Sequence, residues 1–222
     1  MNKKPKAIFF DLDGTLLDTA ADIGTALNRV LQKRGIAPLS LEILRSRVYG
    51  GSRVLLKQIL NMDENHPEFE TLKKEFHQDY RDHLVSQTTF FPGMDDVLHY
   101  LEKEKIQWGV ITNKPAWLAE PLLEHFKLTQ RSACIIGGDT LPFCKPHPAP
   151  LLHACQLANT TSDQVCYVGD SEVDITAAKN AGMFSLLAAY GYIPHDVDPN
   201  SWGADYYLHQ PRDIIEWLKN LP

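Results

Sequence analysis

Short apolar runs and amphipathic stretches alternate along the chain from residue 90 onward. Each run ends in or next to Gly, Asp or Asn, which is typical of parallel strands buried on both faces. The runs are QWGVIT (107–112), ACIIGG (133–138), QVCYVGD (164–170) and FSLLAA (184–189). Between them, apolar residues recur at the three- and four-residue spacing of helices, as over 94–101 and 118–126. This alternation predicts an α/β fold with a parallel sheet.

The N-terminal part of the chain follows a different pattern. AIFF (7–10) has the character of one more strand of the same sheet, but only helical patterns follow it between residues 20 and 85. FFPG (90–93) marks the return to the core pattern. We therefore expect a helical lobe inserted after the first strand of an α/β core, with the lobe spanning 17–88 and the core spanning 1–16 and 89–222.

Composition is that of an ordinary globular protein. Of the 222 residues, 44% are hydrophobic and 23% charged, and the formal net charge is −6. This charge, without a dense Lys/Arg cluster, argues against a surface that binds nucleic acid or anionic membrane. The first apolar stretch has only four residues before Asp11, too few for a signal sequence or a membrane span. The four cysteines lack CxxC spacing and predict buried free thiols, which suits a reducing cytoplasm.

Polar side chains stand at the ends of three of the predicted strands. Asp11 and Asp13 follow AIFF, and residues two apart in an extended chain point to the same side. Thr112 with Asn113 ends a second run, and Asp170 ends a third. Because ligands of open α/β sheets bind beyond the carboxyl ends of the strands, we expect these side chains to surround one site.

Taken singly, each of these motifs also has a purely structural interpretation. Asp-Gly is a turn dipeptide, Thr112-Asn113 alone is a cap or turn, and Lys145 alone is a solvated charge. In GDSEVD (169–174), Asp170 or Ser171 is suited to cap the next helix. A calcium loop is excluded because the glycine of DLDG stands at position 4 rather than 6. The joint order of the motifs is what favours a catalytic site.

Four segments of the chain resemble a known family. DLDGTLLD, ITNK, CKPHPAP and GDSEVDI are similar to the four successive motifs of the haloacid-dehalogenase-type phosphatases, in the family's order and over essentially the whole chain. The resemblance implies a Rossmann-like core with a helical cap inserted between the first and second motifs. This agrees with the insertion expected from periodicity.

The resemblance also implies a role for each motif residue. Asp11 takes the role of the nucleophile that becomes an aspartyl-phosphate, and Asp13 that of the acid that protonates the leaving alcohol and then activates water. Mg²⁺ is required because an anion attacks a phosphate dianion. The implied metal ligands are Asp11, the backbone carbonyl of Asp13 and Asp170, with Asp174 in support. The implied donors to the phosphoryl oxygens are Thr112, Asn113 and Lys145.

Two substrates are implied by closer resemblances within the family. VITNKP, IIGGDT, KPHPAPLL and VGDSEVDITAAKNAG are similar to phosphoglycolate phosphatases, whereas WGVITNKP and the tail GYIPHDVDPNSWGAD are similar to N-acetylmuramic acid 6-phosphate phosphatases of cell-wall recycling. The expected partner is thus a small phosphorylated metabolite, with no nucleic acid and no membrane. Monomer and homodimer both remain open.

The segment YGGSRVL (49–55) is the candidate for substrate recognition by the lobe. Gly50 and Gly51 allow the backbone to approach a ligand, and Arg53 is suited to grip a carboxylate. The alternative is a helix start that Ser52 caps, with Arg53 solvated. Arg53 does not discriminate between the two substrates, since both carry a carboxylate.

Two other functional classes remain open at this point. A signalling receiver module also gathers acidic residues, a threonine, a lysine and Mg²⁺ at strand ends, but a bare receiver has no use for an inserted cap. A sugar-phosphate phosphotransferase passes the phosphoryl group from the same aspartate to a sugar instead of water.

Overall fold

A sheet of six parallel strands forms the centre of the protein. The structure is a computed structural model that describes residues 1 and 3–222. The strand order is β5-β4-β1-β6-β7-β8, and each neighbouring pair is parallel. The strands are β1 (Ala7–Phe10), β4 (Gln107–Ile111), β5 (Ile135–Ile136), β6 (Val165–Gly169), β7 (Phe184–Ala188) and β8 (Tyr206–Leu208). The α/β class and the parallel sheet predicted from the pattern are confirmed.

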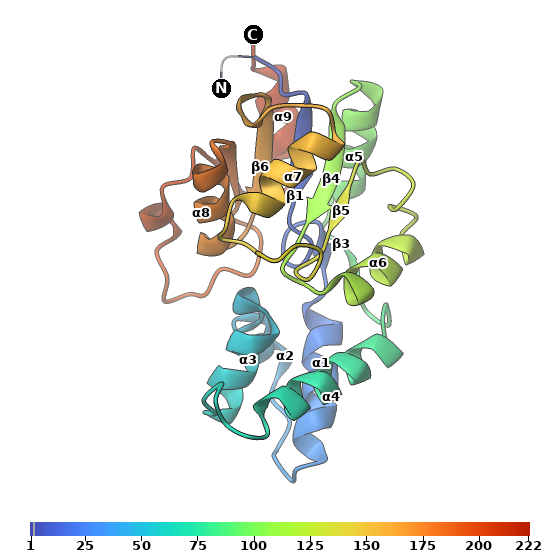
Figure 1. Cartoon of the computed structure of the whole chain (residues 1–222), viewed down its shortest axis with the longest axis vertical. Coiled ribbons are helices and arrows are strands. Elements are labelled where there is room, and N and C mark those ends of the chain that lie inside the picture. Colours follow the sequence, from blue (N-terminus) through green and yellow to red (C-terminus); the bar gives the residue numbers. More distant parts are fainter. Residues whose placement is uncertain (2) are drawn as a thin grey trace.

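Helices cover both faces of this sheet, which explains the continuous apolar runs (Figure 1). Ile8 and Phe10 of β1 belong to one hydrophobic cluster, whereas Ala7 and Phe9 belong to a second cluster on the other face. The first face packs against α5 (Met94–Lys103), α6 (Ala116–His125) and α9 (Asp213–Lys219), and the second against α7 (Ala149–Leu157) and α8 (Glu172–Ala181).

The strand order places β1 at a topological switch point. The chain moves from β1 outward through β4 to β5, then returns to place β6 on the other side of β1. Crevices at such points are where open α/β sheets bind ligands. The segments after β1 and β6, which carry Asp11 and Asp170, therefore flank the same crevice.

Four helices lie together beyond the carboxyl edge of the sheet (Figure 1). They are α1 (Ala20–Gln32), α2 (Leu41–Arg45), α3 (Gly51–Leu60) and α4 (Phe69–Asp82), and we call them the cap helices. They are connected to the core through β2 (Leu17–Asp18) and β3 (Thr89–Phe90), which pair antiparallel. The expected division at 17–88 falls at this two-strand ladder. That these bounds divide the chain into two domains stays a prediction.

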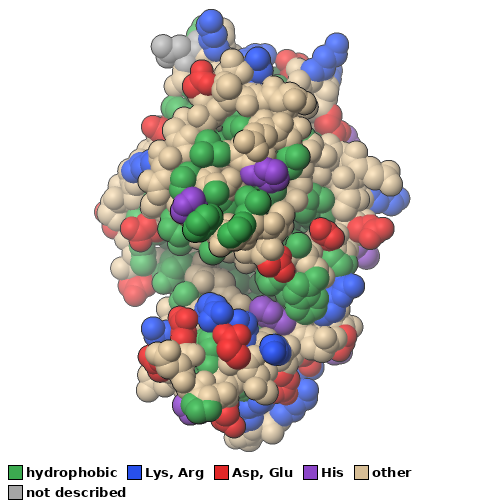
Figure 2. All heavy atoms as spheres, in the orientation of Figure 1, with side chains coloured by type: hydrophobic (Ala, Val, Ile, Leu, Met, Phe, Trp, Pro, Cys, Tyr) green, Lys and Arg blue, Asp and Glu red, His purple; other side chains and the backbone are tan. Residues whose placement is uncertain are grey.

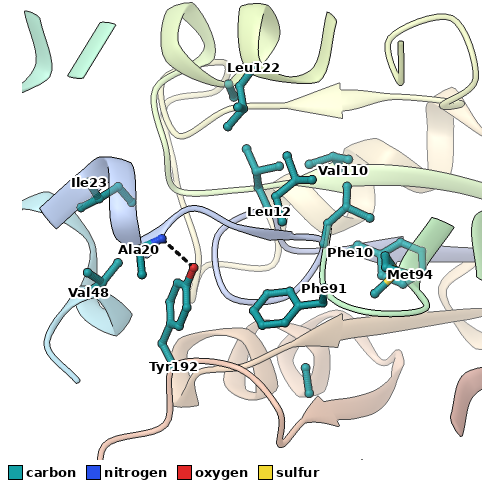
Figure 3. Close-up of a cluster of buried hydrophobic side chains, with 14 of the residues drawn as sticks. Phe10, Leu12, Ala20, Ile23, Val48, Phe91, Met94, Val110, Leu122 and Tyr192 are labelled. Carbon is teal, nitrogen blue, oxygen red and sulfur yellow. Dashed lines mark hydrogen bonds between the residues drawn. The ribbon is translucent and has the colours of Figure 1, made fainter. Parts of the chain in front are cut away.

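A tyrosine from the C-terminal part joins the first cap helix to the core. The Tyr192 hydroxyl accepts hydrogen bonds from the amides of Thr19 (2.7 Å) and Ala20 (2.9 Å) and donates to Asp18 Oδ1 (2.8 Å). Figure 3 shows its ring between the core side chain Phe91 and the start of α1. Since the Thr19 side chain makes no cap bond, Tyr192 satisfies amides that the helix start leaves free.

Some elements differ from the predicted pattern. Within the segment predicted to be helical, the α-helix that begins at Leu41 ends at Arg45, and a 3₁₀ turn follows at Val48–Gly50. The short strand β8 was not expected, because a three-residue edge strand has too few residues for a recognisable alternation. All four cysteines are free as expected, but Cys144 is exposed rather than buried, since it lies in a surface loop. No helix in the described part of the chain has the length and hydropathy needed to cross a membrane.

Candidate active site

Three carboxylates from separate segments meet beside the sheet edge. Asp11 follows β1, Asp170 follows β6, and Asp174 lies in the first turn of α8. One oxygen from each lies within 4.8 Å of the others. Ser171 caps α8 in a capping box with Asp174, which confirms the predicted helix cap in GDSEVD. The same segment also brings Asp170 and Asp174 to the site.

Lys145 is the cation at the centre of this group. Its ammonium lies 2.9 Å from Asp11 Oδ1 and donates to Asp174 Oδ1 (2.7 Å), the Tyr167 hydroxyl (2.8 Å) and the Ile111 carbonyl (3.0 Å). Only 3% of Lys145 is exposed. Burial acts to lower the pKa of Lys145, but the carboxylates of Asp11 and Asp174 outweigh it and raise the pKa. Lys145 is therefore a fixed, permanently charged group.

The carboxylates nevertheless carry more negative charge than the lysines offset. Burial raises the pKa of Asp11 to about 7, against the lowering effect of Lys145, and the charge of Asp174 adds to the rise. Burial, followed by the charges of Asp174 and Asp11, also raises the pKa of Asp170 well above its ordinary value. Such shifts are typical of acidic groups gathered in a site of low polarity.

Asp13 is held from two sides at the mouth of this group. The Thr19 hydroxyl donates to its Oδ1 (2.7 Å), and the Lys114 ammonium contacts Oδ1 at 2.9 Å and Oδ2 at 3.0 Å. Gly14 follows with φ +81°, and a Cβ there would lie 2.0 Å from Asp170 Oδ2. The DLDG turn therefore requires glycine both for its backbone conformation and for the close approach of Asp170.

The neighbouring residues Thr112 and Asn113 lie in the same site, but their side chains form hydrogen bonds with different partners. The Thr112 hydroxyl accepts from the Lys114 amide (3.1 Å), which leaves its own proton free to donate. The Asn113 side chain donates to the Lys145 carbonyl (2.9 Å) and accepts from the Lys145 amide (3.0 Å). A direct role of Asn113 toward a phosphoryl group stays a prediction. Its side chain fixes the loop that presents Lys145.

The glycine segment of the cap reaches the site, whereas its arginine does not. Gly50, Gly51 and Ser52 line the cleft between the cap helices and the core. Arg53 instead pairs with Glu64 (3.4 Å) and Glu70 (3.0 Å), and 51% of its side chain is exposed. The reason is helical geometry: the cleft face of α3 carries positions 52 and 55, and position 53 is rotated away from it. Arg53 is thus not among the residues that line the cleft, and its role in substrate recognition stays a prediction.

The cleft contains about 850 Å³ of space free of protein atoms, part of which is open solvent. Figure 2 shows the surface hollowed between the core and the cap helices. Several lining residues were missed by the sequence analysis, namely Lys114, His77, Tyr80 and Tyr192. Lys114 stands inside the ITNK motif and was quoted without a role. His77 and Tyr80 carry no local signal, because only the packing of α4 brings them to the cleft.

The carboxylate group fits a divalent cation. Asp11, Asp170 and Asp174 offer hard oxygen donors, which are the ligands that Mg²⁺ prefers. With Asp13 they supply four carboxylates against the two ammonium groups of Lys114 and Lys145, and a divalent cation offsets the excess of two negative charges.

Comparison with known proteins places this site in a family. A family model described as haloacid dehalogenase-like hydrolase matches residues 8–188. A phosphoglycolate phosphatase of Xanthomonas campestris is 43% identical over 213 residues, with 96% of each chain covered. An N-acetylmuramic acid 6-phosphate phosphatase of Pseudomonas putida is 36% identical over 209 residues, with 94% of each chain covered.

A solved structure gives the same assignment. The crystal structure described as a predicted phosphoglycolate phosphatase from Haemophilus somnus superposes with a TM-score of 0.84 at 29% identity, covering 96% of this chain and 97% of the other. The family model and the relatives agree with the four motifs and with the fold. The chain belongs to the haloacid dehalogenase-like hydrolases and is an enzyme of their phosphatase type.

Proposed function

We propose that this enzyme hydrolyses a small carboxylate-bearing phosphate monoester, as phosphoglycolate phosphatases do, through an aspartyl-phosphate on Asp11. The observation that carries the proposal is the convergence of Asp11, Asp13, Lys145 and Asp170 on one crevice beneath a cap. The relative with 43% identity, named phosphoglycolate phosphatase, supports this substrate class.

Two carboxylates have separate roles, Asp11 in phosphoryl transfer and Asp13 in proton transfer. Asp11 attacks phosphorus, the P–O bond to the alcohol breaks, and Asp13 gives its proton to the leaving oxygen. Asp13 then accepts a proton from the water that attacks the aspartyl-phosphate, which releases phosphate and restores Asp11. Two groups are needed because Asp11 is esterified while the proton moves. The bonds from Thr19 and Lys114 hold Asp13 in place beside Asp11.

The surroundings of Asp11 supply positive charge and donors for the phosphoryl oxygens. Lys145 and the Thr112 hydroxyl stabilise the charge that spreads over these oxygens in the transition state. Asp11, the Asp13 carbonyl and Asp170 would hold Mg²⁺, which when bound would screen the repulsion between the carboxylate and the phosphate. Asp174 supports the site by fixing Lys145.

A second candidate substrate is N-acetylmuramic acid 6-phosphate. It is favoured by the relative of that name with 36% identity, whose match covers 94% of this chain. The tail similar to that group contributes Tyr192, which lines the cleft. Phosphotransfer to a sugar is a third possibility for the same aspartate. The receiver interpretation lacks support, since the chain belongs to a hydrolase family.

The substrate is tested by comparing kcat/KM for phosphoglycolate and N-acetylmuramic acid 6-phosphate in one Mg²⁺ buffer. We expect a preference for phosphoglycolate of more than about tenfold, which equals roughly 1.4 kcal/mol of transition-state discrimination. Inorganic phosphate is expected in stoichiometric excess over enzyme. A reversed preference would assign the second substrate, and transfer to added sugar without phosphate release would indicate a phosphotransferase.

Mg²⁺ is expected to stabilise the protein more as the pH rises from about 5 to 8. The folded metal-free protein keeps a proton on Asp11 up to about pH 7, against an ordinary pKa of 3.8, so its stability falls as pH rises through this window. Mg²⁺ favours the ionised carboxylates and reverses this loss. The measurement is the difference in Tm between Mg²⁺ and chelator at pH 5.5 and 8. An equal difference at both pH values contradicts the proposed ligands.

A cytoplasmic location and the oligomeric state, monomer or homodimer, stay predictions. The structure contributes only that its described helices include no candidate membrane span.

A further inference from the structure

Lys114 is a buried lysine at the boundary between the core and the cap helices. It lies in the loop after β4, only 6% of its side chain is exposed, and among the described residues its one carboxylate partner is Asp13. Its ammonium lies 4.4 Å from the centre of the Tyr80 ring, which belongs to cap helix α4. Burial acts to lower the pKa of Lys114, but Asp13 and Tyr80 together outweigh burial and raise it, which keeps the ammonium charged. The cleft thus contains a fixed cation at the boundary of core and cap.

The other cation of the site is already committed. Lys145 contacts Asp11, Asp174, the Tyr167 hydroxyl and the Ile111 carbonyl, and the proposed mechanism directs its charge to the phosphoryl group. No arginine and no third lysine is among the described residues that line the cleft. A substrate with a second anionic group beside its phosphate therefore finds one cation for that group, namely Lys114.

The cap places further polar groups beside Lys114. The Tyr80 hydroxyl is buried without a hydrogen-bond partner in the described part of the chain, and Tyr80 as a whole is 3% exposed. A buried hydroxyl without a partner lowers the stability of the free protein. A bound ligand that forms a hydrogen bond with it removes this cost. His77, one turn earlier on α4, also lines the cleft, with its ring against Trp117. Donors from the cap and a cation from the core thus face the same space.

We propose that Lys114 and the Tyr80 hydroxyl bind the carboxylate of the substrate. This subsite accepts only substrates whose carboxylate lies close to the ester oxygen. The inference rests on the proposed function, since Asp13 is there the group that protonates the ester oxygen. Because Lys114 touches both oxygens of Asp13, an anion bound to Lys114 lies beside that ester oxygen. The substrate carboxylate takes the place of Asp13 on Lys114, and Asp13, still bound by Thr19, turns to the ester oxygen.

This geometry distinguishes the two candidate substrates. In phosphoglycolate the carboxyl carbon is separated from the ester oxygen by one methylene group. In N-acetylmuramic acid 6-phosphate the lactyl carboxylate and the phosphate ester are attached at different positions of the sugar ring. A subsite next to Asp13 favours the short spacing. It also gives Lys114 the recognition role that the sequence analysis assigned to Arg53.

The test compares Lys114→Met with the wild type on two esters of nearly equal size, phosphoglycolate and ethyl phosphate. Both values of kcat/KM are expected to fall, because Asp13 loses a positioning contact. The ratio in favour of phosphoglycolate is expected to fall further by about 10- to 100-fold, the range for a lost hydrogen bond to a charged group. Lys114→Arg is expected to retain most of the ratio. Lys73→Met is the control, because Lys73 is a partly buried cap lysine outside the cleft lining.

A wild-type series of longer esters, with three and four carbons between ester oxygen and carboxylate oxygens, is expected to lose the preference stepwise. An equal fall for both esters in Lys114→Met would overturn the inference and leave Lys114 acting only through Asp13. Failure of the wild type to release phosphate from any of these esters would instead overturn the proposed function.

Tyr80→Phe provides a second test that does not depend on the lysine variant. Removal of an unpartnered buried hydroxyl is expected to raise the Tm of the ligand-free protein, while the KM for phosphoglycolate rises several-fold. The two effects have opposite signs, which a purely structural role does not produce. An unchanged KM for phosphoglycolate together with an unchanged ratio in Lys114→Met contradicts the subsite.

Discussion

Asp11→Asn is expected to remove phosphate release almost completely, by at least about 10⁴-fold, while the protein stays folded. An amide cannot form the acyl-phosphate, and the remaining groups only bind the ester. Stability is expected to be retained, because burial disfavours the charged form of Asp11 in the metal-free protein. The measurement combines phosphate release under saturating substrate with thermal unfolding at pH 7.5.

The matched control for this variant is Asp22→Asn. Asp22 is also buried, but it accepts hydrogen bonds from the Gln87 amide and from the amide and hydroxyl of Thr88, outside the cleft. Its substitution is expected to lower stability by roughly 1–3 kcal/mol and to leave catalytic turnover in place. Full activity of Asp11→Asn would remove Asp11 from the nucleophile's role.

Lys145→Met is expected to have the second large effect, on stability and turnover together. The variant leaves the carboxylates of Asp11 and Asp174 buried without their cation, which costs about 3–5 kcal/mol in the metal-free protein. For a chain of this length that corresponds to a Tm lower by roughly 10 °C. Turnover falls by about 10²–10³-fold, because a donor to the phosphoryl oxygens is lost.

The loss of Tm in Lys145→Met is expected to depend on pH. The unpaired carboxylates protonate at low pH, so the loss of Tm is expected to be smaller at pH 5.5 than at pH 8, and Mg²⁺ is expected to restore part of it at pH 8. Lys219→Met serves as the control, since Lys219 forms an exposed pair with Glu216 and its loss is expected to change Tm little. A Tm of Lys145→Met equal to that of the wild type would contradict the buried network.

The sequence predicted the convergence of the acidic residues better than it predicted which cap residues line the cleft. Asp11, Asp13 and Asp170 were identified because strand-terminal residues of a parallel sheet share an edge, a rule that depends only on strand periodicity and order. Asn113 was predicted to lie in the site, but the bonds by which its side chain holds the Lys145 loop were not predicted. A hydrogen bond between residues 32 positions apart leaves no mark in a local pattern.

Arg53 and Lys114 show that the sequence alone did not reveal which cations line the cleft. Arg53 was chosen because it follows two glycines, yet the rotation of α3 turns it toward Glu64 and Glu70. Lys114 lies in the ITNK motif and was given no role from the sequence. The packing of α4 against the core encloses it with Tyr80 and Asp13.

The amino-acid sequence alone determined the class of fold, the inserted helices and the strand ends that carry the acidic residues, because buried strands and amphipathic helices impose their periods locally. Only the tertiary structure decided which charges pair, how the Tyr192 hydroxyl meets the start of α1, and which cap residues face the cleft. Those features depend on the rotation and approach of elements far apart in the chain, and no single segment encodes them.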